Sequence, residues 1–452
     1  MKTRIFIFII ATFLLILPLG AQNKWINLFN GKDLSGWIQK AGSAKYSVEG
    51  NTIIGTTVLN SPNSFLCTEK NYDNFILELD FKVDTNLNSG VQIRSESSPD
   101  YQNGKVHGYQ VEIDPSARAF TGGIYDEARR GWLVPLTTNE TARKAFKQNE
   151  WNHFRIEALS DSIRIWINNI PSAWLIDNLT HTGFIGLQVH DIGTDSAKLG
   201  IKVRFKNIRI LTEDVAKYCQ RTDPANIQVN MISNILSPLE LANGWKLLFD
   251  GISTKGWRGA HKKNFPDKGW KVTDGTLMVE GSKGEEAANG GDIVTLDEYT
   301  NFEISLEYKL TKGANSGIKY YVTEKENPHG SAIGLEYQLL DNANHPDAKL
   351  GSHEGSRVNA ALYDLIKPFH TRENALGEWN RARIVSKGTH VEHWLNGFKV
   401  LEYERGSDEF KSLVCDSKYR KWKNFGIAPK GHILLQDHGD EVSFRSIKIR
   451  EL

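Results

Sequence analysis

An internal duplication constrains this chain more than any other feature. Leu28–Gly31, followed by Gly36-Trp37, recurs as Leu248–Gly251, followed by Gly256-Trp257. Further blocks recur in the same order, and an ordered series of matched blocks indicates repeated structural units. We therefore predict two copies of one domain, at about 24–212 and about 243–452. The further pairs are Asn88–Val91 with Asn315–Ile318, Gly108–Ile113 with Gly334–Leu339, Glu150–Asn152 with Glu378–Asn380, Trp166–Asn168 with Trp394–Asn396, Leu187–His190 with Leu435–His438, and Phe205–Ile210 with Phe444–Ile449.

Each copy is built from short runs rich in β-branched and aromatic residues. Phe75–Lys82, Ile163–Ile167 and Phe302–Tyr308 alternate apolar with polar residues, as half-buried strands do. Helical periodicity is nearly absent. The pattern predicts an all-β chain of two tandem β-sandwiches of the jelly-roll type, each offering one concave face for chemistry.

The segment between the copies, 213–242, lacks strand alternation. It contains Asp223-Pro224 and Ser237-Pro238, each of which places a capping side chain before a proline at the first helical position. We predict a linker with two short helices.

The N-terminus has the layout of a secretory signal peptide. Lys2 and Arg4 precede an apolar run from Ile5 to Leu17, and a small-residue stretch ends at Ala21. The run is short for a membrane span of roughly 20 residues, although an anchor is the alternative. No lipobox cysteine follows it. We expect residues 1–21 to be removed and the mature protein to be soluble, in the periplasm or secreted.

Charge and cysteine content exclude several classes. The 55 Lys and Arg residues against 54 Asp and Glu residues give a net charge of +1. The sequence therefore predicts no strong positive electrostatic field that would attract a nucleic acid. Cys67, Cys219 and Cys415 are far apart and include no CxxC pair, which excludes a disulfide framework but not a single bridge.

The matched blocks are long enough to suggest a family. Both copies resemble the 3-keto-disaccharide hydrolase family, also described as domain of unknown function 1080, whose fold is a concanavalin-like or laminin-G-like sandwich. The resemblance covers almost the whole chain after the leader. In the second copy it rests on Leu248–Gly251, Asn315–Gly317, Glu336–Asn342, His345-Pro346, Ala361–Tyr363, His393–Gly397 and Leu435–Gly439. In the first copy it rests on Asn88–Gly90, His107–Asp114, Thr121–Trp132 and Leu187–His190.

The resemblance implies cleavage of glycosides whose glucose ring carries a ketone at C3. A lyase-type member removes the C2 proton and expels the C1 substituent, giving a 3-keto-2-hydroxyglucal, and a hydratase-type member adds water to that product. The chemistry is reasonable because a C3 ketone acidifies the C2 hydrogen, so that a side-chain base can remove it. A divalent metal ion of unspecified identity would stabilise the enolate, and no organic cofactor is needed. The expected partner is a small carbohydrate.

The candidate site of the second copy follows from strand alternation. Glu336 and Gln338 are two residues apart on a predicted strand and therefore share a face, although a solvated convex face is the alternative. Asp341 and His345 follow in a loop, and His438 lies two residues after Gln436. The candidate catalytic residues are Glu336, Asp341, His345 and His438, with Glu336 and His438 as candidate metal ligands. Gln338, Tyr363, Gln436 and His393 are substrate-binding candidates; His393 fits the core equally well, and Lys319 and Tyr321 are weaker candidates.

The first copy keeps the outline with different polar residues. Gln110 replaces Glu336, Glu112 replaces Gln338, and Arg94 replaces Tyr321. Because the polar sets differ on one scaffold, we predict that one copy eliminates and the other hydrates. The catalytic candidates here are Glu112, His107 and His190. The substrate-binding candidates are Gln110, Arg94, Asp114, Tyr125, Arg129, Arg130 and Gln188, although Tyr125–Trp132 could also be a salt-bridged surface loop.

Two other functions remain open. A retaining glycosidase needs two carboxylates flanking the bond, and Glu112-Ile-Asp114 begins such a pattern, but Ala117 stands where a third acid would complete it. A non-catalytic tandem carbohydrate-binding protein would use exposed tryptophans as stacking platforms. The candidate platforms are Trp37, Trp132, Trp257, Trp270 and Trp394.

Overall fold

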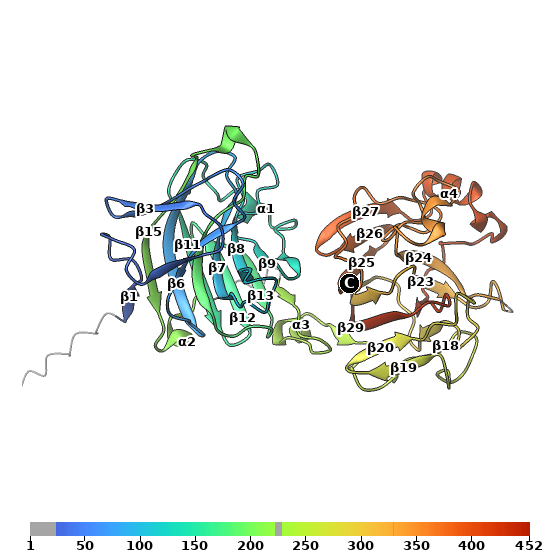
Figure 1. Ribbon diagram of the computed structural model, residues 1–452. Coiled ribbons are helices and arrows are strands. Elements are labelled where there is room, and N and C mark those ends of the chain that lie inside the picture. The colour runs from blue at the N-terminus through green and yellow to red at the C-terminus, as the bar shows by residue number, and fades with distance from the viewer. Residues whose placement is uncertain (1–23, 222–227, 329) are drawn as a thin grey trace, which may run out of the picture.

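The computed structural model describes residues 24–221, 228–328 and 330–452. It consists of two β-sandwiches side by side with a short connecting segment between them (Figure 1). This confirms the all-β class and the tandem arrangement. The predicted leader lies outside the described residues. Within them, no helix is long and apolar enough to cross a membrane.

The first sandwich is formed by two sheets whose strands pair antiparallel, apart from the parallel pair of β13 and β16. One has the order β16-β13-β12-β11-β6-β15-β4-β3, with β1 beside β15, and the other has the order β10-β9-β8-β7-β14-β5-β2. The strands of the first sheet are β1 (Trp25–Asn27), β3 (Lys45–Glu49), β4 (Thr52–Thr56), β6 (Phe75–Val83), β11 (Asn152–Leu159), β12 (Ser162–Ile167), β13 (Ile170–Ile176), β15 (Lys202–Leu211) and β16 (Gln228–Asn230). Those of the second are β2 (Trp37–Lys40), β5 (Ser64–Thr68), β7 (Ser89–Glu96), β8 (His107–Ile113), β9 (Ile124–Glu127), β10 (Gly131–Val134) and β14 (Phe184–Val189), and short helices α1 (Glu140–Arg143) and η1 (Ser196–Lys198) lie in its loops.

The second sandwich repeats this plan. One sheet has the order β19-β20-β29-β22-β25-β26-β27, with β17 beside β29, and the smaller sheet has the order β18-β21-β28-β23-β24. The strands of the first sheet are β17 (Lys246–Leu247), β19 (Trp270–Thr273), β20 (Thr276–Val279), β22 (Phe302–Leu310), β25 (Asn380–Lys387), β26 (His390–Leu395), β27 (Phe398–Glu404) and β29 (Val442–Glu451). Those of the smaller sheet are β18 (Trp257–Gly259), β21 (Ile293–Thr295), β23 (Asn315–Thr323), β24 (Ile333–Leu340) and β28 (His432–Leu435), and the helices are η2 (Pro346–Lys349), α4 (Asp408–Cys415) and η3 (Lys418–Lys421).

Alternation along the strands fills each core. On β24, Leu335, Tyr337 and Leu339 are fully buried against the facing sheet, whereas Glu336 and Gln338 point to the opposite face of their own sheet. That opposite face is also largely covered, because loops and short helices pack over it. The smaller sheet therefore has an apolar inner face and a covered polar outer face, and the polar face is the one available for chemistry.

The connecting segment is only partly the predicted linker. Ser237 caps helix α3 (Pro238–Ala242) as predicted, in a capping box with Glu240. The segment also contains a helix that was not predicted, α2 (Val215–Tyr218). The helix predicted to begin at Asp223-Pro224 lies outside the described residues and stays a prediction. The segment also contributes β16, which pairs in parallel with β13 of the first copy. Three residues are too short to reveal strand alternation, so the sequence did not predict this strand.

Side chains of the two copies meet directly. Phe398 of the second copy is buried in the hydrophobic cluster of the first, 6.0 Å from the ring centroid of Phe120. Thr137 donates a hydrogen bond to the carbonyl oxygen of Gly397 at 2.7 Å. Cys67, Cys219 and Cys415 are all free thiols.

Candidate functional site in the second copy

A polar cavity of about 380 Å³ lies on the covered outer face of the smaller sheet of the second copy. Its floor is formed by β23, β24 and the chain after β28. It is of the size that small polar ligands occupy. The residues of its floor are Asn315, Lys319, Glu336, Gln436 and His438, and its walls include Glu286, Asn327, Tyr363, Lys418, Tyr419 and Trp422.

A charged pair occupies the middle of the floor. Lys319 on β23 is the register partner of Glu336 on β24, and the two side chains are only 7% and 5% exposed. The Lys319 Nζ also lies 3.7 Å from Oδ2 of buried Asp292. Two carboxyls and one ammonium thus lie near one another with little exposure to bulk solvent, where charges interact more strongly than at an open surface.

Burial and neighbouring charge act in opposite directions on these groups. Burial raises the pKa of Glu336 above its usual range, although the positive charges of Lys319, Lys418 and His438 partly offset the effect. Burial alone would lower the pKa of Lys319, but the charges of Asp292 and Glu336 outweigh it and raise that pKa. Lys319 therefore favours its protonated, positively charged form. The pKa of the Glu336 carboxyl lies closer to neutral pH than the pKa of an exposed glutamate.

The Asn-Ser-Gly block explains why this floor is built as it is. A Cβ atom at Gly317 would lie 2.3 Å from Oε1 of Glu336, so only glycine leaves room for the carboxyl. Ser316 donates to the carbonyl oxygen of Gln436 at 2.8 Å and ties β23 to β28. Asn315 accepts from Gln338 at 3.0 Å, and its amide nitrogen lies 3.5 Å from Nε2 of His438. Each residue of the block positions a different neighbour.

The outer wall comes from an insertion that the sequence analysis missed. The first copy passes from β13 to β14 through residues 177–183, whereas the second passes from β27 to β28 through residues 405–431. This longer segment carries α4 and η3 and brings Lys418, Tyr419 and Trp422 to the cavity. The difference in length between the matched blocks was the available signal, together with the mixture of cations and aromatic residues in Lys418–Trp422.

Tyr363 and Lys418 form the other side of the wall. The Lys418 ammonium lies 4.2 Å from the centre of the Tyr363 ring, and the Tyr363 hydroxyl donates to Asp347 at 2.9 Å. Arg357 pairs with Asp347 at 2.8 Å and with Asp364 at 2.8 Å. Burial raises the pKa of Tyr363, which keeps the phenol protonated. These bonds fix the ring rigidly at the cavity edge.

The structure brings Glu336, Tyr363, Gln436 and His438 together in the cavity. Two other candidates, Asp341 and His345, stabilise local backbone structure instead. Asp341 holds the turn after β24, accepting from the backbone of Gly313 at 2.8 Å and from Asn344 at 2.7 Å. His345 caps η2 by accepting from the Asp347 backbone, although its ring is 6.3 Å from that of His438. Neither residue lines the cavity. Gln338 is on the predicted face but fully buried beneath it.

His393 and Tyr321 lie in the core. His393 bonds with the Tyr320 hydroxyl at 2.8 Å, and burial lowers its pKa to about 3. The core alternative for His393 is therefore the one observed. Tyr321 sits at a β-bulge with φ +52°, which turns its ring inward to the Ser386 hydroxyl at 2.7 Å. Simple alternation fails at the bulge, which is why Tyr321 does not reach the site.

The first copy has amides at the same two positions. Gln92 on β7 is the register partner of Gln110 on β8, and Gln92 donates to Gln110 at 2.7 Å. Gln110 donates in turn to Glu112 at 2.9 Å, and Asn88 donates to Glu112 at 2.7 Å. Burial raises the pKa of Glu112 to about 7. The predicted face is therefore observed, but its polar groups are engaged with one another.

The glutamine of the Leu-Gln block is buried in both copies. Gln188 is fully buried, with neither amide atom bonded, and Oε1 of Gln436 is likewise without a partner in the described chain.

Tyr125 lies opposite Gln110 on the same face, and its ring packs against Trp132 at 5.4 Å. His190 is at the edge, with Nδ1 2.7 Å from the Asp191 carbonyl oxygen.

Two charged candidates of the first copy are structural. Arg94 occupies a bulge with φ +46° and is fully buried, donating to the carbonyl oxygens of Asp73 at 2.8 Å and Ser160 at 2.7 Å. Asp114 pairs with Arg118 at 2.7 Å and accepts from the Ser116 backbone, which closes the turn after β8. The bulge turns the Arg94 side chain away from the polar face, and both carboxylate oxygens of Asp114 already accept hydrogen bonds within the turn. Neither Arg94 nor Asp114 is therefore available to bind a sugar.

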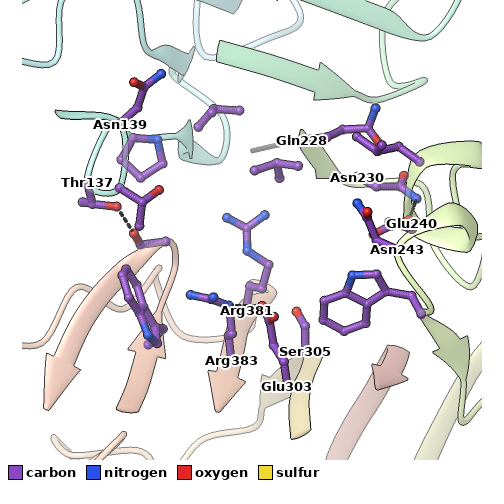
Figure 2. Close-up of a pocket in the computed structure, with 18 of the residues that line it drawn as sticks. Thr137, Asn139, Gln228, Asn230, Glu240, Asn243, Glu303, Ser305, Arg381 and Arg383 are labelled. Carbon is purple, nitrogen blue, oxygen red and sulfur yellow. Dashed lines mark hydrogen bonds and ion pairs between the residues drawn. The ribbon is translucent and has the colours of Figure 1, made fainter. Parts of the chain in front are cut away.

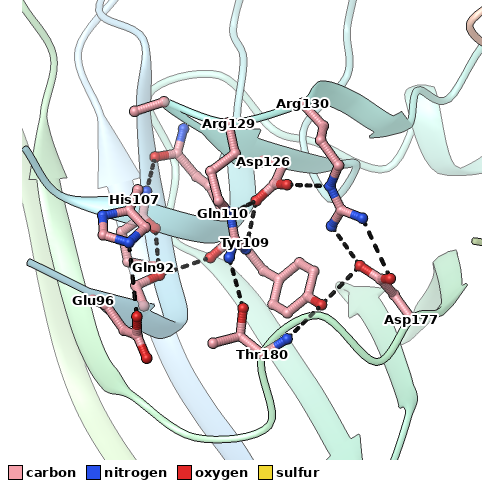
Figure 3. A network of polar contacts seen from close by, with 12 residues as sticks. Gln92, Glu96, His107, Tyr109, Gln110, Asp126, Arg129, Arg130, Asp177 and Thr180 are labelled. Atoms are coloured by element: carbon pink, nitrogen blue, oxygen red, sulfur yellow. Dashed lines mark hydrogen bonds and ion pairs between the residues drawn. The ribbon is translucent and has the colours of Figure 1, made fainter. Parts of the chain in front are cut away.

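Arg129, Arg130 and His107 have other polar or stacking partners, which lie near Gln92 and Gln110 (Figure 3). Asp126 accepts from both arginines, at 2.7 and 2.6 Å, and Arg130 also pairs with Asp177 at 2.5 Å. The salt-bridged alternative is thus the correct one for this loop. His107 stacks on Tyr101 with the ring centroids 3.8 Å apart, and its Nδ1 lies 2.9 Å from the Lys105 carbonyl oxygen.

The cavity residues do not fit a divalent metal ion. Glu336 and His438 are not part of any trio of closely spaced donors; in the described part of the chain, the trio of that kind is His390, Glu392 and Glu402 on the outer surface. The positive charges of Lys319 and Lys418 act on Glu336 and oppose the binding of a second cation. Lys399 pairs with both glutamates of the surface trio in the same way.

Most of the predicted stacking platforms are buried framework residues. The indole NH groups of Trp37 and Trp257 donate to the carbonyl oxygens of Leu28 and Leu248, at 2.8 and 2.6 Å, which are equivalent bonds in the two copies. Trp270 and Trp394 are also buried, and Trp132 is half-buried against Phe120 and Tyr125. The partly exposed tryptophan at the cavity is Trp422.

The fold and the cavity define a tandem β-sandwich protein with a charged small-molecule pocket in its second half. The model of the 3-keto-alpha-glucoside-1,2-lyase-like domain matches residues 24–211 and again residues 244–450, so the chain belongs to that family and contains two copies of its domain. A 3-keto-disaccharide hydrolase from Bacteroides thetaiotaomicron is 40% identical over 233 residues, which are 47% of this chain and 79% of the relative. A crystal structure named "putative glycosyl hydrolase", from Parabacteroides distasonis, is 34% identical and covers 49% of this chain and 99% of its own, with a TM-score of 0.43.

Proposed function

We propose that the second copy cleaves 3-keto-glucosides by removing the proton at C2 and expelling the substituent at C1, with Glu336 as the base. The single observation that carries the proposal is the buried carboxyl of Glu336 at the floor of the cavity, directly opposite a buried ammonium. Membership of the 3-keto-alpha-glucoside-1,2-lyase-like family supports this substrate class.

Glu336 suits proton abstraction from carbon. Its raised pKa makes the carboxylate a stronger base than an exposed glutamate. The charges of the nearby cations favour the ionised carboxylate, which is the form that accepts a proton. In the proposed step the carboxylate takes the C2 proton and the C–H electron pair forms the C2–C3 double bond. Negative charge then moves to the C3 oxygen.

Lys319 and Lys418 provide the positive charge that this oxygen needs. Lys319 lies on the cavity floor with a raised pKa, and Lys418 faces the same space from η3. An ammonium placed where an oxyanion develops stabilises the transition state in a site from which water is largely excluded. We therefore assign enolate stabilisation to these lysines and derive no step through a metal ion.

His438 completes the proposed reaction. The negative charge on the C3 oxygen re-forms the C3 carbonyl, and the electron pair of the C2–C3 double bond moves to form a C1–C2 double bond. The C1–O bond breaks, its electron pair leaves on the oxygen, and that oxygen takes a proton from His438, whose ring lines the same cavity. The products are the free aglycone alcohol and a 3-keto-2-hydroxyglucal. Tyr363 and Trp422 contribute binding surface for the sugar and the aglycone.

We assign elimination to the second copy and not to the first. The first copy lacks a lysine–carboxyl pair at the equivalent register positions, and its Gln92, Gln110 and Glu112 bond to one another. The predicted hydration of the glucal by the first copy remains a prediction without an assigned residue. The predicted export of the protein is likewise part of this proposal, because a periplasmic or secreted enzyme would meet extracellular glycosides.

The test is to incubate the full chain with a 3-keto glucoside and with the unoxidised parent glucoside, following the aglycone and the glucal. We expect turnover of the keto sugar alone. Turnover of the parent sugar would contradict the proposed mechanism, because C2 deprotonation requires the C3 ketone.

A further inference from the structure

A second cavity, of about 420 Å³, lies between the two copies and is independent of the catalytic pocket (Figure 2). The first copy contributes the chain after β10, the connecting segment contributes β16 and α3, and the second copy contributes β22, β25 and β29. The cavity is within the size range of small-molecule sites. A ligand bound there would touch both sandwiches at once.

Its charged residues are paired, with one exception. Arg383 and Arg450 both pair with Glu303 at 2.5 Å, and Lys448 pairs with Glu240 at 2.5 Å. These cations of the cavity wall are therefore neutralised locally, although three positive groups share two carboxylates. The remaining cation of the lining is Arg381.

Arg381 has only weak contacts. Its guanidinium donates to the Leu133 carbonyl oxygen at 3.3 Å and approaches the Met231 sulfur at 3.2 Å. Among the described residues, Arg381 forms no salt bridge; Glu307, whose charge acts on it, pairs with Arg445 at 2.7 Å instead. Figure 2 shows Arg381 extending from its strand into the middle of the residues that line the cavity.

An unpaired guanidinium in this position is costly. Burial lowers the pKa of Arg381, and the charge of Arg383 acts in the same direction, although the negative charge of Glu307 opposes them in part. Arg381 is half-buried, and its weak contacts replace only part of the hydration that its charge has lost. An anion with two oxygens would satisfy the planar fork of donors, as a carboxylate does.

The rest of the lining suits a hydroxylated ligand. Gln228, Asn243 and Ser305 carry amide and hydroxyl groups, and Trp245 provides an aromatic wall whose ring lies 5.2 Å from the Arg450 guanidinium. We propose that this cavity binds a sugar acid, that is, a small polyhydroxylated carboxylate, with Arg381 holding the carboxylate. Bound there, it joins the two copies and strengthens their association.

The experiment is isothermal titration of the full chain with sodium glucuronate and, separately, with neutral glucose. The wild type and a Glu336→Gln variant are expected to bind glucuronate equally and glucose much more weakly. Arg381→Met is expected to weaken glucuronate binding about tenfold or more, because a hydrogen-bonded ion pair is lost. Arg381→Lys keeps the charge without the fork and should bind with intermediate affinity.

Lys246→Gln is the matched control, since it removes the same charge from exposed β17 outside the cavity. It should bind as the wild type does, and circular dichroism should show every variant folded. Equal binding of glucose and glucuronate, no binding by the wild type, or unchanged binding by folded Arg381→Met would overturn the proposal. Loss of glucuronate binding in Glu336→Gln would place the ligand in the catalytic pocket and would overturn it as well. None of these results depends on turnover of a keto sugar.

Discussion

Lys319 and Glu336 face each other across β23 and β24 in the register that Gln92 and Gln110 occupy in the first copy. The same strand geometry thus places a lysine opposite a glutamate in one sandwich and a hydrogen-bonded amide pair in the other. A buried amide pair can satisfy itself by hydrogen bonding, whereas a buried lysine and carboxyl next to a cavity retain the capacity to move a proton and stabilise a charge.

Lys319→Met should reduce turnover of a 3-keto glucoside by about 10²-fold, because one stabilising donor for the enolate is lost. It should also move the acidic limb of the pH dependence of kcat/KM to higher pH. Glu336 must be ionised to act as a base, and without the Lys319 charge its already raised pKa rises further. Lys411→Met, at an exposed helix position, is the control. An acidic limb that stays in place would show that Lys319 does not act on Glu336.

Removal of metal ions should leave turnover unchanged. The charge that stabilises the proposed enolate comes from Lys319 and Lys418, which the cavity already contains. Dialysis against a chelator, followed by rate measurements with and without added Mg²⁺, Ca²⁺ or Mn²⁺, checks this. A loss of activity that a divalent ion restores would favour the metal-assisted route predicted from the sequence.

Glu112 should make the first copy less stable as the pH rises. Its pKa is raised by burial to about 7 from an ordinary value of 4.5, so the folded state holds this proton more tightly than the unfolded state. The resulting stabilisation is fully present below about pH 4.5 and is lost as the pH rises through about 7, a change of about 3 kcal/mol. Glu112→Gln should remove this part of the pH dependence in urea unfolding at pH 5 and pH 8. Parallel pH dependence in the two proteins would contradict the assignment.

Gly397→Ala should destabilise the contact between the copies. A Cβ atom there would lie 2.7 Å from Cγ of Pro135, and the residue has φ +85°. Gly388→Ala is the matched control, because Gly388 has φ +61° and open space around its Cβ position. Both should cost about 1 kcal/mol for the left-handed backbone, and Gly397→Ala about 1–3 kcal/mol more for the clash. Equal shifts in thermal unfolding would indicate that the Pro135 contact adapts without cost.

The sequence predicted the repeated β-sandwich because each matched block carries alternation, and alternation is a local property. It also placed Glu336, Gln436 and His438 correctly on one face. Alternation failed at Arg94 and Tyr321, where bulges with positive φ reverse the direction of the side chains. A bulge depends on the pairing of two strands and has no signature within one of them.

Strand alternation could not place the wall of the cavity, although the extra length of the second copy between its matched blocks was a signal for an insertion. Lys418 and Trp422 come from a segment without a counterpart in the first copy, and they reach β24 only through the tertiary packing of η3. Asp341 and Asp114 show the opposite error. Asp114 was predicted on the polar strand face and Asp341 in the loop beside it, but local turns use the carboxylate oxygens of both, as they commonly do with short polar side chains after a strand.

In the proposed mechanism, Glu336 removes the C2 proton of a keto sugar. The most direct measurement is proton NMR of a 3-keto glucoside in D₂O with the wild type, Glu336→Gln and, as the matched carboxyl-to-amide change in the first copy, Glu112→Gln. We predict that the wild type and Glu112→Gln consume the C2–H signal at equal rates, and that Glu336→Gln is slower by about 10²–10⁴-fold. Loss of the C2–H signal in Glu336→Gln at the wild-type rate, or its persistence only in Glu112→Gln, would contradict the account.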